Sequence, residues 1–178
     1  AIYGSRGANG VILITTRKGK AGTSSLNYSV STGVSTLANA LPVFNAADYK
    51  REVVALGGVL EDFKGSTDWQ KEITRSAFTQ NHNVSLSGGA GKLSYYGSLG
   101  MQLQEGIIKG NDLKRYTGRL NVTQKLLDDR LVVDFNMNAT NTVNNRPDIG
   151  GLIGGALSTN PTIPAYDSAG NPFRFQNG

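Results

Sequence analysis

The sequence contains no cysteine and a single histidine, His82, among its 178 residues. The lack of thiols excludes cysteine nucleophiles, disulfides and cysteine-ligated zinc, and one imidazole cannot form a histidine cluster for a transition metal. Cysteine usage therefore leaves the cellular compartment open.

Long apolar runs and blocks of like charge are absent as well. The longest apolar runs, Val11–Ile14 and Val53–Leu56, are far shorter than the roughly 20 residues of a membrane-spanning helix. They do not exclude a bilayer, because a β-barrel crosses it without such runs. The 18 Lys and Arg are scattered among 13 Asp and Glu, for a net charge of +5, which argues against a nucleic-acid-binding patch.

What the chain has in quantity is glycine and uncharged polar residues. It holds 23 Gly, only 17% of its residues are charged, and 38% are hydrophobic. Gly, Ser, Thr and Asn are poor helix formers, so the composition argues against a helical bundle, and the low charge argues against a disordered tail. The composition predicts an ordered, β-rich chain.

Strict alternation of apolar and polar residues runs through Ser25–Ser35 and dominates the sequence from Thr79 onward. A period of two predicts strands with one apolar and one polar face. The predicted strands are about ten to thirteen residues long, which is enough to cross a bilayer at a tilt. The predicted apolar face includes Leu26, Tyr28, Val30 and Val34, then Val84 and Leu86, Leu93, Tyr95 and Leu99, Tyr116, Leu120 and Val122, and finally Leu131, Val133, Phe135 and Met137.

The connections between these strands alternate in length. Tight turns are predicted at Gly88–Lys92 and Leu126–Arg130, whereas residues 36–78, 105–114 and 143–178 form longer connections. Short turns on one side and long loops on the other are typical of an outer-membrane barrel. A water-soluble sandwich or solenoid, with the apolar face as its core, explains the alternation alone equally well.

Two short helices are predicted inside the first long connection. Asn45 can cap a helix over residues 46–56 that ends at Gly57, and Thr67 with Gln70 resembles a capping box for a helix through Ile73. The chain opens at Ala1 without a signal peptide and stops in loop-like sequence, which predicts a piece of a longer protein.

The opening run, AIYGSRGANGVILITTRKGK, resembles the end of the plug domain of TonB-dependent outer-membrane transporters, in the form of the SusC/RagA branch. Further motifs of that branch follow in order over roughly residues 1–146: Asn45–Tyr49, Thr67–Gln70, Gln80–Gly89, Gln104–Gly110 and Lys114–Asn121.

The resemblance implies an all-β fold, namely part of a transmembrane up-and-down antiparallel β-barrel with the C-terminal end of a plug domain and short helices in an extracellular loop. Residues 1–22 would hold the end of the plug and its connection to the barrel, and residues 23–178 the first barrel strands and loops. The plug motif is given a structural role at Tyr3, Gly4, Arg6, Gly7, Asn9 and Gly10. The spacing of its glycines matches no phosphate-binding loop, and a predicted strand follows where such a loop needs a helix.

The function implied by the resemblance is active import of a nutrient across the bacterial outer membrane. The implied partners are TonB, engaged through a region upstream of this segment, a SusD-like surface lipoprotein and the lipid of the outer membrane. A glycan oligosaccharide is the first expected cargo and a peptide the second, because the branch serves both. The alternative is a non-transporting surface or adhesion β-protein.

Enzymatic activity is not expected, because no nucleophile with a base, carboxylate dyad or metal cluster can be assembled from the sequence. Accordingly, no catalytic residue, cofactor or metal ligand is predicted. His82 is predicted at the rim of a strand, Asp128 and Asp129 as turn formers, and Trp69 in an ordinary packing role, with stacking on a sugar ring as its alternative.

Overall fold

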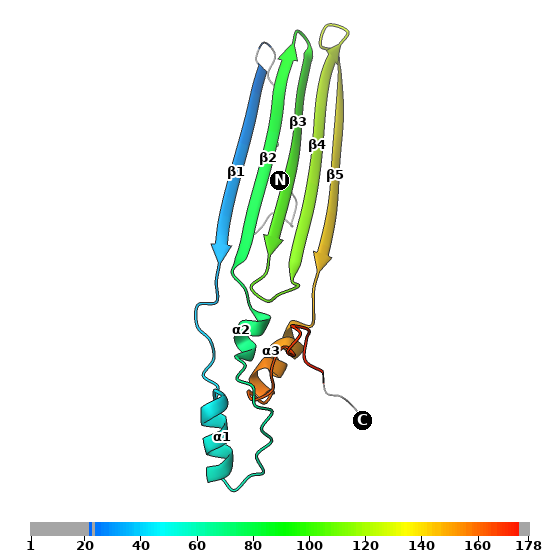
Figure 1. The fold of residues 1–178 in the computed structure, drawn as a ribbon. Helices are drawn as coiled ribbons and strands as arrows, with labels where there is room; N and C mark the ends of the chain where they lie inside the picture. Colours follow the sequence, from blue (N-terminus) through cyan, green and yellow to red (C-terminus); the bar gives the residue numbers. More distant parts are fainter. Residues whose placement is uncertain (1–21, 23, 175–178) are drawn as a thin grey trace, which may run out of the picture. The chain divides into compact units, whose positions relative to one another are not determined.

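The structure, a computed structural model, describes residue 22 and residues 24–174. Five strands form one sheet in the order β1-β2-β3-β4-β5 (Figure 1). Their bounds are Ser24–Ser35 for β1, Ala77–Ala90 for β2, Leu93–Glu105 for β3, Asp112–Leu126 for β4 and Leu131–Asn145 for β5. Since each strand pairs with its successor, the sheet is the up-and-down meander that the alternation predicts, and the all-β antiparallel fold class is confirmed.

The strands have 12 to 15 residues, slightly longer than predicted. Both tight turns are confirmed. Gly91 takes φ +56° between β2 and β3, where a left-handed residue closes the hairpin. Between β4 and β5, Leu127, Asp128 and Asp129 all have positive φ, at 49°, 53° and 67°. Asp128 and Asp129 are therefore turn residues, as predicted.

Three short helices lie in the longer connections. The first, α1 (Ala46–Ala55), begins where predicted because the Asn45 side chain accepts from the Asp48 N–H. It ends at Ala55, and its C-cap Leu56 is followed by Gly57 with φ +70°. The second, α2 (Trp69–Ile73), was predicted correctly, but the predicted cap was wrong.

Asp68, not Thr67, caps α2, because its carboxylate accepts from the Lys71 N–H. The two residues of the predicted capping box have other partners: the Thr67 hydroxyl donates to the Ile163 carbonyl, and the Gln70 amide pairs with the backbone of Leu41. The third helix, α3 (Ile149–Ser158), was not predicted, and Asp148 caps it by accepting from the Gly151 N–H.

The described residues fall into two compact units. One holds residues 82–100 and 116–141 with the start of β1, which are the strand halves next to the short turns; the other holds residues 30–81, 101–115 and 142–174, with the other strand halves and the helices. Across the described residues, the buried apolar side chains are Pro161 and three alanines, Ala46, Ala77 and Ala156. The sheet therefore has no large apolar core of its own in this part of the chain.

Candidate functional site

One face of the sheet is held together by polar contacts between neighbouring strands. The Asn81 amide donates to the Ser31 hydroxyl at 3.2 Å, joining β2 to β1. Arg119 on β4 donates from Nε to the Asn138 amide oxygen on β5 at 2.9 Å, and the Thr123 hydroxyl donates to the carboxylate of Asp134. All of these residues belong to the predicted polar face, so the two-sided pattern of the sequence is present in the structure.

Gly100 leaves room on this polar face for side chains of the adjacent strands. A methyl group at Gly100 would lie 2.5 Å from the Thr117 hydroxyl and 3.3 Å from the Asn83 amide. A side chain there would therefore displace Thr117 or Asn83, whereas glycine lets β2, β3 and β4 present their polar groups together.

The opposite face is apolar and largely exposed. On β1, Leu26 is 69% exposed and Val34 67%; on β5, Phe135 is 52% exposed and Met137 51%. Contiguous exposed apolar surface of this kind marks contact with a membrane or another protein.

The single histidine lies on the apolar face. His82 is the sixth residue of β2, its ring stacks on Tyr28 with centroids 6.1 Å apart, and its Nδ1 is 2.6 Å from the Tyr28 hydroxyl. Its predicted place at the strand rim was wrong, because β2 begins five residues earlier, at Ala77.

In the second unit, Arg75 ties the connection between β3 and β4 to the residues before β2. Its Nε donates to the Gly106 carbonyl at 3.1 Å, its Nη2 pairs with Asp112, and its Nη1 is 3.7 Å from Glu105. Glu105 in turn accepts from the Phe78 N–H at 3.0 Å. This cluster fixes residues 106–111 as a defined loop rather than a free one.

The first long connection is clamped by the segment that follows α3. The hydroxyl of Thr162, which is completely buried, accepts from the Phe63 N–H at 3.2 Å. Its one proton is shared between the Asn160 amide oxygen at 2.8 Å and the Glu61 carbonyl at 3.2 Å. The Gly65 N–H donates to the Thr162 carbonyl at 2.6 Å, and the Thr67 N–H donates to the Pro161 carbonyl at 2.9 Å. Residues about 100 positions apart in the sequence thus form one small loop module.

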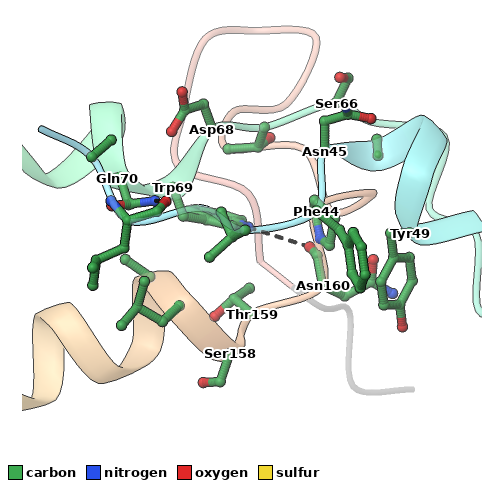
Figure 2. Close-up of a pocket in the computed structure, with 18 of the residues that line it drawn as sticks. Phe44, Asn45, Tyr49, Ser66, Asp68, Trp69, Gln70, Ser158, Thr159 and Asn160 are labelled. Carbon is green, nitrogen blue, oxygen red and sulfur yellow. Dashed lines mark hydrogen bonds between the residues drawn. The ribbon is translucent and has the colours of Figure 1, made fainter. Parts of the chain in front are cut away.

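A hollow of about 660 Å³ lies inside this module, entirely within the second unit. Its walls come from the extended stretch before α1, from the start of α2 and from the end of α3 with the turn that follows it. The apolar lining comprises Ala40, Leu41, Pro42, Val43, Phe44, Ala46, Trp69, Ala156, Leu157 and Pro161. Figure 2 shows Phe44 and Tyr49 at one edge and the indole of Trp69 in the wall, where its N–H donates to the Asn160 carbonyl at 3.2 Å. Trp69 therefore forms part of the wall of the hollow, and its stacking on a sugar stays the alternative prediction.

Hydrogen bonds lower the pKa of two acids of this unit, Asp62 and Asp167. The Lys50 ammonium, 2.7 Å away, lowers the pKa of Asp62, and the backbone N–H of Lys64 acts in the same direction. The backbone N–H of Asn171 lowers the pKa of Asp167. These shifts mark loop geometry rather than an acid–base pair, because the carboxylates bind cations and backbone amides.

Within the described residues, no three His, Cys, Asp or Glu side chains gather into a group that could hold a metal ion. No helix described here is both long enough and apolar enough to cross a membrane. The predicted plug motif, Tyr3, Gly4, Arg6, Gly7, Asn9 and Gly10, lies outside the described residues. The division at residues 22 and 23 stays a prediction.

No family model matches the chain. Among curated proteins, the TonB-dependent receptor SusC of Bacteroides thetaiotaomicron is 37% identical over 182 residues, which is 100% of this chain and 18% of SusC. The TonB-dependent receptor P26 of Formosa agariphila is 32% identical over 184 residues, covering 96% of this chain and 18% of P26. The chain therefore spans about 18% of the length of these relatives.

Solved structures agree with these sequence matches. The RagAB peptide importer in its closed-closed state aligns with a TM-score of 0.74 at 26% identity, covering 97% of this chain and 24% of that one. The meandering sheet and these relatives together define the class of protein. The chain belongs to the TonB-dependent receptors. More narrowly it is SusC/RagA-like, as its motifs predict.

Proposed function

We propose that the protein containing this segment imports a nutrient across the bacterial outer membrane, with β1 to β5 as part of its barrel wall. The observation that carries the proposal is the pairing of an exposed apolar face with a hydrogen-bonded polar face on one sheet. An apolar face towards lipid and a polar face towards a wet or plugged lumen account for both. A soluble sandwich would instead need a second layer to cover Leu26, Phe135 and Met137.

The proposed partners follow from the branch. TonB would supply the energy through a part of the receptor outside this segment, and a SusD-like lipoprotein would cover the extracellular side. Residues 1–22, with the motif from Tyr3 to Gly10, would complete the plug. The module with α1, α2 and α3 would then lie among the extracellular loops, because it follows the strand ends opposite the short turns. The cargo is an oligomeric nutrient, either a glycan oligosaccharide or a peptide.

The proposal is tested with the full-length receptor in its host. We expect the protein in the outer-membrane fraction, and we expect uptake of a labelled oligosaccharide or peptide that stops when TonB is depleted. Recovery of the receptor from the soluble fraction would refute the barrel assignment. Outer-membrane location with uptake unchanged by deletion of the receptor would favour the alternative, a surface or adhesion protein.

A further inference from the structure

The hollow in the loop module has no role yet in the proposed function. Its volume of about 660 Å³ falls in the range of roughly 300–1,000 Å³ that is usual for ligand pockets. Phe44, at its edge, is 59% exposed, and Leu41 is 55% exposed. A wall that keeps large apolar side chains in contact with water gains free energy when a ligand covers them.

Most polar side chains that line the hollow already have partners inside the module. The Asn45 amide is bonded at both ends to Asp48, and the Gln70 amide is bonded at both ends to the backbone of Leu41. Asp68 accepts from the Lys71 N–H and pairs with the Lys71 ammonium at 3.1 Å.

The polar groups on the α3 side are used in the same way. The Asn160 amide nitrogen donates to the Glu61 carbonyl, while its oxygen accepts from the N–H and the hydroxyl of Thr162. The Ser158 hydroxyl donates to the Gly154 carbonyl at 2.9 Å. The lining amides and the Asp68 carboxylate are therefore engaged within the module, and the hydroxyls of Tyr49, Ser66 and Thr159 are the lining polar groups without a partner among the described residues. The hollow therefore favours an apolar group.

The stretch in front of α1 adds main-chain groups to this apolar wall. Residues 36–44 run without helix or strand, and the N–H and C=O of Val43 have no hydrogen-bond partner among the described residues. Exposed main-chain groups beside a side-chain pocket suit an extended peptide, because backbone pairing supplies affinity and the pocket selects the side chain.

We propose that this hollow is a subsite for an apolar side chain of an extended peptide cargo, with Phe44, Leu41 and Leu157 as its walls. The proposal rests on the proposed import function and narrows its cargo to peptides. Covering one large apolar side chain in the hollow strengthens binding by about 10- to 100-fold over a glycine at the same place.

The test measures binding to the purified full-length receptor in lipid nanodiscs by calorimetry. The probes are an octapeptide of Gly and Ser with one central Phe, the same peptide with Gly in place of Phe, and maltohexaose. We expect the Phe peptide to bind about 10- to 100-fold more tightly than the Gly peptide, and the difference to vanish in Phe44→Ser and in the filling variant Ala40→Trp.

Val59→Ser is the matched control, because Val59 is 91% exposed in the same connection but does not line the hollow. It should leave the Phe preference intact. Equal binding of the two peptides, maltohexaose binding that is lost in Phe44→Ser, or an effect of Phe44→Ser confined to association with the lipoprotein partner would overturn the subsite.

Uptake in cells separates this inference from the proposed function. TonB-dependent uptake without the Phe preference would leave the importer standing and remove the peptide subsite. Selective peptide binding without uptake would leave the subsite standing and remove the importer.

Discussion

The two faces of β5 should respond very differently to a charge. Met137 is the seventh of the 15 residues of β5, close to its middle, and is 51% exposed on the apolar face, whereas its neighbour Asn136 is on the polar face. If the apolar face contacts lipid, Met137→Arg places a guanidinium near the bilayer midplane, which costs about 2–4 kcal/mol. On a water-exposed surface the same change costs less than about 0.5 kcal/mol.

Asn136→Arg is the matched control, because it adds the same side chain at the same depth on the opposite face. Asp134, two residues away on the polar face, can accept the new charge, so we expect a cost below about 1 kcal/mol. The assay is a denaturant titration of the full-length receptor in lipid vesicles, followed by the heat-dependent migration of the folded barrel. Equal costs at positions 136 and 137, or a cost below about 0.5 kcal/mol at position 137, would refute the lipid-facing assignment.

Three further predictions concern the second unit. Gly65→Ala should destabilise the contact between residues 61–67 and residues 161–164 by about 1–3 kcal/mol, because its methyl group would lie 2.6 Å from the Pro164 nitrogen. Hydrogen exchange of these residues should become faster. Gly154→Ala, in open space, should stabilise α3 instead. Arg75→Lys removes the guanidinium bonds to Gly106 and Asp112, which should destabilise the loop of residues 106–111 by about 1.5–3 kcal/mol. This loop should then become sensitive to protease. Unchanged resistance to protease would contradict the role of Arg75 in holding it. The Asn171 N–H keeps the pKa of Asp167 below its unfolded value, so its turn should be fully stabilised above that unfolded value and lose this stabilisation as the pH falls through the folded pKa. The protection factor of this turn, which is the intrinsic exchange rate divided by the observed rate at each pH, should therefore fall with pH in the native protein but stay constant in Asp167→Asn.

The strands could be predicted because side-chain alternation is a local property. Each residue of β5 points to the face opposite its neighbour, so Phe135 and Asn136 assign the two faces without any knowledge of what covers them. The first helix was equally local, since Asn45 and Gly57 mark its two ends.

The third helix was missed although part of its signal is present. Asp148 is a good cap, and Ile149, Leu152, Ile153, Ala156 and Leu157 recur at helical spacing. Four glycines interrupt this pattern, at positions 150, 151, 154 and 155, and each lowers helix propensity by about 1 kcal/mol. Packing of α3 against α2 supplies stabilisation that the sequence window does not contain.

The hollow and the clamp could not be predicted, because their contacts are distant in the sequence. Trp69 meets Asn160 across 91 positions, and Thr162 meets Glu61 across 101. Thr67 shows the consequence: its spacing to Gln70 is that of a capping box, but the Ile163 carbonyl takes its hydroxyl and Asp68 caps the helix. No local pattern contains the competing partner.

The lipid-facing assignment of the sheet is tested most directly by the accessibility of β5 in a bilayer. A nitroxide placed in turn at each position from Leu131 to Asn141 of the full-length receptor is exposed to oxygen, which concentrates in lipid, and to a water-soluble nickel complex. If the apolar face of β5 contacts lipid, oxygen collisions peak at Leu131, Val133, Phe135 and Met137, while nickel collisions peak at the positions between them. Protection of the apolar positions from both reagents, as in a soluble protein core, would contradict the lipid-facing assignment.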